Sequence, residues 1–356
     1  MKNLDELIKN GFFVSEVRRN RGNIADHFLV ESLRAFFSTA EDLDWYLSSK
    51  IDEKASKEIL VGSYARNACN AITQFQHFFE LFLKDILLEQ NKLLVYDASQ
   101  KPELLIKLIN GEKVLNSELE KMHFIECSEA ILRIKALHKS GKLDSNYLFV
   151  ANYIDLFEKL NALRNRIAHR GAFIITPPAL NEVFGRFVFP FINELENVKG
   201  YGNLRLWSFN LKTRELNPFE AISKDYFNGL VDENKIHLYK LIGAASYKNK
   251  IDFDLDEVFS VINDEIREQA ESIAQTLADR NRTVEAIECP ICGCNSFVRE
   301  MDCYVGEDEY GNEITSEPYV YRISCGQCGF HIENWLLSKL KEFNIPMLDY
   351  SQWYLR

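Results

Sequence analysis

The sequence predicts a mainly α-helical protein that ends in a small β domain. Over the first two thirds of the chain, apolar residues recur at the three- and four-residue steps of amphipathic helices. Near the C-terminus the pattern changes to two C-x-x-C-G sequences with strand-like segments between them. We therefore expect a helical bundle over residues 1–200, a helical connector over 201–284, and a small β domain with a C-terminal helix over 285–356.

Composition and charge limit the functional classes. The chain has 356 residues, which is enough for several domains with a well-buried core. Its net charge of −11 argues against a general nucleic-acid binder, because non-specific affinity for phosphates comes from summed positive charge. Acidic residues stand near the start of the chain, where a signal peptide carries basic residues. No apolar run has the length of a membrane span. We therefore expect a cytoplasmic protein without membrane contact.

Two long helices are expected early in the chain, over residues 24–49 and 57–90. The second helix carries a polar stripe within an arc of roughly 80° opposite its apolar face. The stripe consists of Arg66, Asn70, Thr73, His77, Glu80 and Lys84. Such a stripe is usually the wet face of a bundle helix. Its histidine, asparagine and threonine, however, form directed hydrogen bonds and leave a functional role open.

The apolar periodicity places the remaining helices over residues 101–110, 116–140, 153–170 and 180–198, the last of them broken or kinked near Pro190. The connector is expected to form helices over 221–234, 236–247 and 255–279. A final helix is expected over 335–343, in the C-terminal β domain. Nothing in the connector indicates catalysis.

The helix expected over residues 153–170 ends in an unusual cluster of polar residues, Leu160-Asn-Ala-Leu-Arg-Asn-Arg-Ile-Ala-His-Arg-Gly171. Its apolar residues recur at helical spacing and face a core. On the remaining arc Arg164, Asn165, Ala168 and His169 cover roughly 140°, at 100° per residue. The helix therefore presents a broad polar face with three arginines nearby.

The sequence from Arg164-Asn165 to His169 resembles the signature of the HEPN superfamily, in which an arginine and a polar residue precede a histidine. Members of this superfamily are helical bundles, and many are metal-independent ribonucleases. The resemblance covers the motif and the helical region around it, over about residues 20–200. In HEPN folds the motif helix packs beside an earlier long helix with polar residues. The resemblance thus makes Glu80 and His77 candidates for the cleft that holds His169.

Cleavage of RNA without a metal requires activation of the ribose 2′-hydroxyl, protonation of the leaving 5′-oxygen, and stabilisation of charge on the phosphate. His169 suits the proton transfers, and the neighbouring arginines favour its neutral form. Arg164 offers a planar fork for two phosphate oxygens, while Asn165 can orient the substrate or the histidine. One motif supplies one histidine. HEPN relatives usually pair two motifs across a dimer interface, so the resemblance implies a homodimer that acts on RNA.

The two C-x-x-C-G sequences are Cys289-Pro-Ile-Cys292-Gly293 and Cys325-Gly-Gln-Cys328-Gly329. Each places two thiolates on one side of a tight turn, and the glycine relieves crowding there. Strands are expected over residues 297–305 and 319–324, with a turn over 309–312. This arrangement resembles a zinc ribbon.

Four thiolates leave no position open for substrate, so we expect one structural zinc per chain. Paired knuckles also fit a reducing compartment. Cys294 and Cys303 remain as possible substitutes in a rearranged site, although the knuckle pairs are favoured.

These observations lead to one main hypothesis and two alternatives. The main hypothesis is a metal-independent endoribonuclease whose zinc ribbon positions RNA or senses a protein or nucleic-acid trigger. The resemblance implies a role as a prokaryotic toxin or antiviral defence effector. The alternatives are a catalytically silent HEPN scaffold for dimerisation and a zinc-ribbon nucleic-acid adaptor.

Overall fold

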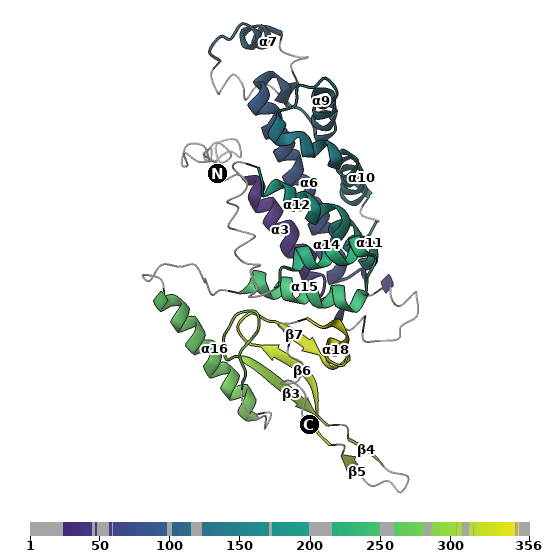
Figure 1. Cartoon of the computed structure of the whole chain (residues 1–356), viewed down its shortest axis with the longest axis vertical. Coiled ribbons are helices and arrows are strands. Elements are labelled where there is room, and N and C mark those ends of the chain that lie inside the picture. The colour runs from purple at the N-terminus through teal and green to yellow at the C-terminus, as the bar shows by residue number, and fades with distance from the viewer. Residues whose placement is uncertain are drawn as a thin grey trace, which may run out of the picture. The chain divides into compact units, whose positions relative to one another are not determined.

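The computed structural model describes residues 24–44, 47, 57–58, 60–97, 102–114, 123–170, 173–198, 216–249, 260–280, 286–303, 305–307, 313–315, 317–345 and 348. It is mainly helical, with small antiparallel sheets of which the largest lies near the C-terminus (Figure 1), as the sequence predicts. The chain divides into two compact units, Met1–Ser32 with Thr73–Asn161 and Leu33–Ile72 with Ala162–Arg356. None of the described helices combines the length and the apolar character needed to cross a bilayer.

The first unit is built around the long helix α6. It includes parts of the helices α3 (Ile24–Ser38), α6 (Ser63–Gln90) and α10 (Ile154–Arg170). Between α6 and α10 the chain forms, in order, η1 (Lys92–Val95), β1 (Tyr96–Asp97), α7 (Pro102–Ile109), β2 (His123–Phe124), α9 (Cys127–Lys139) and η2 (Ser145–Tyr153). The buried face of α6 is rich in phenylalanine, and Phe79 stacks on Phe157 of α10 with ring centroids 4.7 Å apart. This stacking packs α6 beside α10 within the first unit.

Three helix boundaries differ from the predictions. The first long helix ends at Ser38 rather than at residue 49, because Thr39 turns the chain and its hydroxyl donates to the carbonyl of Phe36 at 2.6 Å. The second begins at Ser63 instead of residue 57. The helix predicted over 116–140 begins at Cys127, and the residues just before it pair with β1 as a short strand.

The described helices of the second unit follow the motif helix. They are α11 (Pro177–Val183), η3 (Phe184–Val188), α12 (Phe189–Leu195), α14 (Pro218–Asn228), α15 (Glu233–Lys248) and α16 (Ser260–Arg280). The break predicted near Pro190 is present as the π-helical turn η3, in which the amide of Phe189 donates to the carbonyl of Phe184. Pro190 has no amide proton for the usual helical bond and is accommodated directly after this turn.

Two helix ends in this unit also differ from the predictions. The helix predicted over 180–198 begins at Pro177, because a proline fits the first turn of a helix, where its missing amide costs no bond. The helix predicted over 221–234 ends at Asn228, since Gly229 adopts the left-handed conformation with φ of 66°. Asp232 then caps α15 through the amide of Asn234 at 2.8 Å.

Helix α15 lies in the core of the second unit. Every residue from Ile236 to Tyr247 is buried. Gly243 permits close approach to α3, because a Cβ atom there would lie 2.2 Å from Cδ1 of Phe37. The helices predicted as a connector therefore include a core element. The predicted boundaries near residues 200 and 284 lie outside the described residues and stay predictions.

The core of the second unit also contains a lysine. Lys240 is buried, donates to Oδ1 of Asn181 at 2.9 Å, and lies 4.6 Å from the ring centroid of Phe36. Burial lowers the pKa of this lysine to about 7. One hydrogen bond and one aromatic ring thus hold a charge-bearing side chain inside the protein.

The small β domain belongs to the second unit. Its antiparallel sheet has the order β3 (Phe297–Asp302), β6 (Tyr319–Cys325), β7 (His331–Glu333), and the hairpin of β4 (Val305–Glu307) and β5 (Glu313–Thr315) extends beyond it (Figure 1). Helix α16 packs on β3 through Ala274 and Ala278, which contact Val298. Strand β7 was not predicted. The final helix is divided into α17 (Asn334–Leu337) and α18 (Leu340–Phe343).

Candidate functional site

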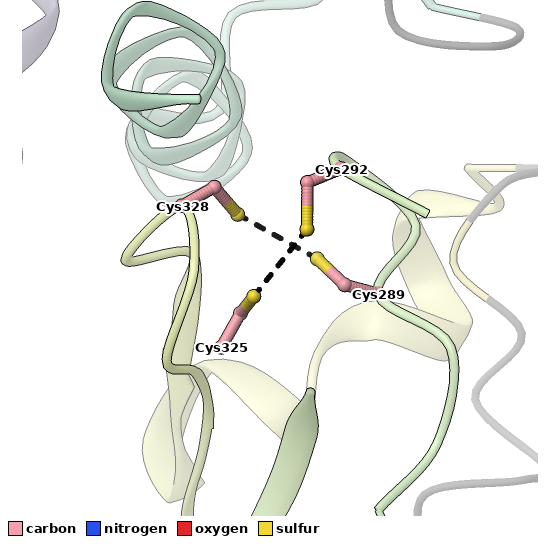
Figure 2. Close-up of side chains that lie close together, drawn as sticks. All are labelled: Cys289, Cys292, Cys325 and Cys328. Carbon is pink, nitrogen blue, oxygen red and sulfur yellow. Dashed lines mark hydrogen bonds between the residues drawn. The ribbon is translucent and has the colours of Figure 1, made fainter. Parts of the chain in front are cut away.

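The four cysteines of the two knuckles form one buried cluster. Their sulfur atoms lie within 4.8 Å of one another, with 3.6 Å between Cys289 and Cys328 and 3.6 Å between Cys292 and Cys325. Figure 2 shows all four side chains pointing toward a common centre. A tetrahedral site with metal–sulfur bonds of about 2.3 Å requires sulfur atoms roughly 3.8 Å apart. The cluster therefore fits a single metal ion held by four thiolates.

The two knuckles have the same backbone geometry. Gly293 and Gly329 both adopt φ of 70°, a conformation that glycine reaches without strain. Their amides donate to the carbonyls of Cys289 and Cys325 at 2.9 and 3.0 Å. In the first knuckle the amide of Ile291 also points at the sulfur of Cys289, at 3.4 Å. These turns hold the two thiols of each knuckle close to each other.

Two helices hold the knuckles in place. On α16, Arg267 donates to the carbonyl of Gly293 at 3.3 Å, and Glu271 accepts from the amide of Asn295 at 3.1 Å. The second knuckle lies against Lys248 at the end of α15, since a Cβ atom on Gly329 would meet its Cδ at 3.5 Å. Such outer contacts orient the ligands of a metal site.

The buried thiols influence each other's protonation. Burial raises the pKa of Cys289, whereas hydrogen bonds from the other thiols lower the pKa of Cys292. Ser296 adds a further contact, with its hydroxyl 3.0 Å from the sulfur of Cys325. A cluster of this kind holds four negative charges only with a cation at its centre.

The two cysteines left over from the knuckles lie outside the cluster. Cys294 is buried, and its carbonyl accepts from the amide of Cys289 at 2.8 Å, so its backbone closes the first turn. Cys303 is partly exposed after β3. The structure thus brings together the four cysteines that the spacing singles out.

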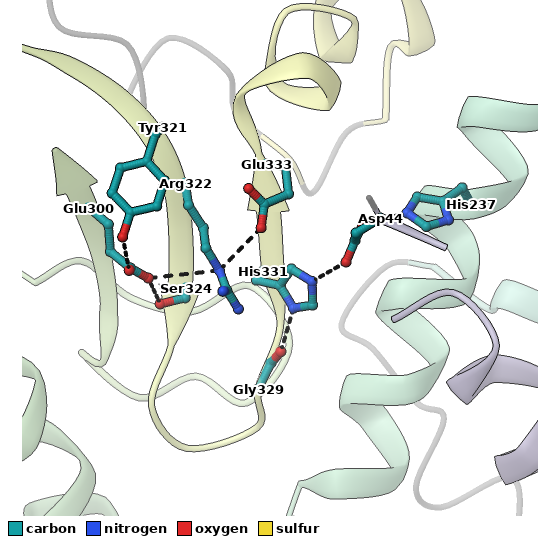
Figure 3. A network of polar contacts seen from close by, with 9 residues as sticks. All are labelled: Asp44, His237, Glu300, Tyr321, Arg322, Ser324, Gly329, His331 and Glu333. Carbon is teal, nitrogen blue, oxygen red and sulfur yellow. Dashed lines mark hydrogen bonds and ion pairs between the residues drawn. The ribbon is translucent and has the colours of Figure 1, made fainter. Parts of the chain in front are cut away.

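A second polar cluster lies beside the β domain and was not predicted. Asp44 accepts from Nε2 of His237 on α15 at 2.7 Å and from Nε2 of His331 on β7 at 2.6 Å (Figure 3). Burial works to raise the pKa of Asp44, but the two histidine bonds lower it to about 2. One carboxylate therefore joins a core helix to the ribbon within the second unit.

The two histidines in this cluster differ in charge. Nδ1 of His331 lies 3.1 Å from the carbonyl of Gly329, and its Nε2 faces a carboxylate, so both ring nitrogens must donate. Burial opposes this charge, but Asp44 raises the pKa of His331. Burial lowers the pKa of His237. We therefore assign an imidazolium at His331 and a neutral ring at His237.

The motif helix has a buried first half and an open second half. Phe157 and Leu160 are buried, Leu163 and Ile167 are half-buried, and Asn165 is exposed. Arg164 donates from one guanidinium nitrogen to Oδ1 of its neighbour Asn165 at 3.1 Å, while its buried Nε has no hydrogen-bond partner among the described residues.

His169 belongs to α10 by its backbone, and its side chain lies outside the described part of the structure. Its role stays a prediction.

The two candidates on the polar stripe have partners of their own in the first unit. Glu80 accepts from Lys84 at 2.6 Å and from Gln76 at 2.9 Å. His77 packs edge-on against Phe28, with ring centroids 5.3 Å apart. Their participation in a cleft with His169 stays a prediction.

Four polar residues at these sites were not identified from the sequence, among them His331 of the Asp44 cluster. Gln76 is buried on α6 and also lies 3.5 Å from Oδ1 of Asn161 on α10, one turn before the motif. The other two are Asp44 and His237, whose partners are far away in the sequence. The helical period of α6 places Gln76 beside buried phenylalanines, so its burial could have been predicted from the sequence.

No family model, no curated protein and no solved structure matches the chain. The resemblance to the HEPN superfamily therefore depends on the motif residues themselves.

We expect the purified chain to bind one metal ion per molecule, because the four thiols form one complete tetrahedral set. Cys292→Ser should reduce the bound metal to well below one equivalent, measured by elemental analysis after gel filtration. Cys303→Ser is the matched control and should retain the full equivalent, because this thiol lies outside the cluster. Equal metal content in both variants would contradict the assignment.

We also expect the Asp44 cluster to stabilise the second unit in a pH-dependent way. Asp44→Asn should lower the free energy of unfolding by about 1.5–3 kcal/mol at pH 6, the range for hydrogen bonds to charged groups. Because the pKa of His331 is raised in the folded protein, its contribution to the free energy of unfolding is fully present below the pKa of 6.5 in the unfolded chain. This contribution is lost as the pH rises through the pKa of the folded state. The deficit should therefore be smaller at pH 9, as measured by urea denaturation.

The control for this experiment is His331→Gln, whose amide can donate to Asp44 without titrating. His237 acts with the opposite sign, since its lowered pKa costs stability only as the pH falls below 6.5. If Asp44→Asn, made in the protein that keeps His331, lowers the free energy of unfolding by the same amount at pH 6 and at pH 9, the assignment of an imidazolium at His331 is contradicted.

Proposed function

We propose that this protein is a metal-independent endoribonuclease of the HEPN type, with Arg164, Asn165 and His169 as its catalytic motif. The observation that carries the proposal is the state of Arg164. No carboxylate among the described residues pairs with its guanidinium, and its buried Nε lacks a hydrogen-bond partner. The side chain of Arg164 is only half-buried, so its outer N–H groups can bind an anion such as a phosphodiester.

The helix geometry supports a shared role for the motif residues. Asn165 and His169 are four residues apart on α10 and therefore share one face, one turn apart. The hydrogen bond to Asn165 fixes one edge of the Arg164 guanidinium. In the proposed reaction the guanidinium neutralises the phosphate, Asn165 orients the substrate or the imidazole, and His169 transfers protons. The 2′-hydroxyl gives up its proton as its oxygen bonds to phosphorus, and the bond from phosphorus to the 5′-oxygen breaks while that oxygen takes a proton.

The metal site has a separate role in this proposal. We propose that it holds one zinc ion, because four thiolates in a closed tetrahedral set favour zinc over harder cations. Bound zinc supplies structural cross-linking of the two knuckles. The ribbon then positions RNA or receives a signal from a partner, and a cytoplasmic toxin or antiviral effector is the biological role that fits best.

The test of catalysis compares variants of the motif on total RNA. Arg164→Ala and His169→Ala should each lower cleavage by a factor of about 100 or more, the scale expected for loss of charge stabilisation or acid/base catalysis. Arg280→Ala is the matched control, because it removes one exposed positive charge on α16. Undiminished cleavage by both motif variants would remove the motif from the mechanism and leave a scaffold or an adaptor.

The chemistry itself provides a second criterion within the same assay. Products should end in a 2′,3′-cyclic phosphate or its hydrolysed form, and a 2′-deoxy substitution at the cut should abolish cleavage. Brief exposure to EDTA should leave the rate unchanged, because a closed structural site does not take part in the reaction. Inhibition by EDTA that magnesium reverses would indicate metal-assisted hydrolysis instead.

We further propose that the active form is a homodimer. The reaction needs a proton acceptor and a proton donor, whereas the motif supplies one histidine. The open half of α10 carries half-buried Leu163 and Ile167 beside the polar residues, which suits contact with a second copy. Light scattering should therefore report twice the chain mass. Efficient cleavage by a strict monomer would refute the composite site and make His77 the better second group.

A further inference from the structure

A pocket of about 670 Å³ lies in the second unit, at the edge of the ribbon. Its volume is within the roughly 300–1,000 Å³ range of small-ligand sites. Three aromatic side chains line it, Tyr319, Tyr321 and Trp335, together with the carboxylates of Asp44 and Glu333. None of the described residues lining the pocket is a lysine or an arginine. Neither the metal site nor the motif helix contributes to this pocket.

The aromatic wall is exposed and ordered. Tyr319 and Tyr321 stand two residues apart on β6 and are 41% and 37% exposed, so both rings can be reached by a ligand. The hydroxyl of Tyr321 donates to Glu300 at 2.8 Å, so this ring has a fixed position (Figure 3). Trp335 extends the wall from α17, where it packs against His237 at 5.6 Å between ring centroids.

The charges around the pocket are arranged for a positive ligand. Asp44 is already held by two histidines, whereas Glu333 pairs, among the described residues, with Arg322, whose Nε lies 3.6 Å away, beyond a short hydrogen bond (Figure 3). Burial raises the pKa of Glu333, and the neighbouring Asp44 and Glu300 raise it further against the pull of Arg322. A cation in the pocket would compensate this carboxylate. A phosphate group would meet two negative walls.

Aromatic rings joined with carboxylates recognise organic cations, because the negative face of each ring adds to the charge of the acid. A contact of this kind already exists at the rim, where Nζ of Lys339 lies 5.9 Å from the ring centroid of Trp335. The indole N–H of Trp335 is buried and has no hydrogen-bond partner among the described residues. A peptide offers both the cation and a carbonyl oxygen for this N–H, whereas a polyamine offers no acceptor.

We propose that this pocket binds an arginine or lysine side chain of a basic peptide segment from a partner protein, with Glu333 as the counter-ion and Tyr319, Tyr321 and Trp335 as the aromatic wall. The site is independent of the ribonuclease proposal. The net charge of −11 adds long-range attraction for a basic partner.

The binding test uses the full, metal-loaded chain and a short capped peptide with two arginines. Its control is the same peptide with citrulline, which keeps the shape of arginine but carries no charge. Calorimetry should show binding of the arginine peptide and at least tenfold weaker binding of the citrulline peptide. Equal affinity for the two peptides would overturn the cation site. Spermidine that binds as tightly as the arginine peptide would overturn the assignment to a peptide.

Substitutions then locate the site. Glu333→Gln should lower the affinity for the arginine peptide at least tenfold. Glu342→Gln makes the same charge change at an exposed position of α18 and should leave this affinity unchanged. Tyr319→Leu removes an exposed ring with little risk to folding and should also weaken binding severalfold. Metal content and the circular dichroism spectrum confirm that each variant is folded. Unchanged affinity in both Glu333→Gln and Tyr319→Leu would overturn the proposal.

The variant Lys339→Met tests whether the ligand is a cation or a nucleic acid. Removal of the resident ammonium from Trp335 should leave the arginine peptide as tightly bound as before or more so, because a competing cation is gone. A single-stranded RNA oligonucleotide would lose affinity in the same variant, since it loses a positive contact. Binding of RNA that depends on both Tyr319 and Lys339 would overturn the proposal in favour of a base-stacking platform.

Discussion

One half-buried carboxylate links three parts of the second unit. Asp44 follows α3 in the chain, and its two oxygens accept hydrogen bonds from α15 and from β7. A largely buried charge is costly unless it is paired and hydrogen-bonded, so loss of His331 would leave Asp44 without its counter-ion. The end of α3, the core helix and the ribbon therefore have one low-energy arrangement with respect to this group.

The ribbon is tied to its surroundings at several points. Arg267 and Glu271 of α16 bind the first knuckle, and Lys248 of α15 pairs with Glu41 and contacts the second. The metal centre thus stabilises more than a small hairpin. A ribbon held in this way is a rigid platform, which suits recognition by fixed side chains.

The sequence predicted features that depend on local spacing and missed those that depend on distant pairing. The knuckles were predictable because each C-x-x-C-G fixes its own turn, and the irregularity near Pro190 followed from a missing amide. Asp44 was not predictable, since its histidines lie 193 and 287 residues away along the chain.

The interpretation of residues 236–247 as a connector missed a core helix, because this helix is buried on all sides although it contains His237, Lys240 and Ser246. The two-residue strand at His123–Phe124 gives almost no periodic signal, and its pairing with Tyr96–Asp97 is a tertiary effect. For the motif, the helix and the burial of one side of it were predictable from the apolar spacing. The hydrogen-bond partners of Glu80 and Gln76 could be identified only from the positions of the side chains in the structure.

The metal centre, the Asp44 cluster and the aromatic pocket share one short piece of chain. Cys325 and Cys328 are metal-site thiols, His331 binds Asp44, and Glu333 lines the pocket, all along β6 and β7. Strand pairing fixes their order, because Ser324 faces His331 and Arg322 faces Glu333. A change in the register of β7 would displace the histidine and the pocket carboxylate together. A metal ion on Cys325 and Cys328 would hold the turn between these strands and so favour the register that places the pocket carboxylate. By linkage, a ligand bound in the proposed pocket would favour the metal-bound turn.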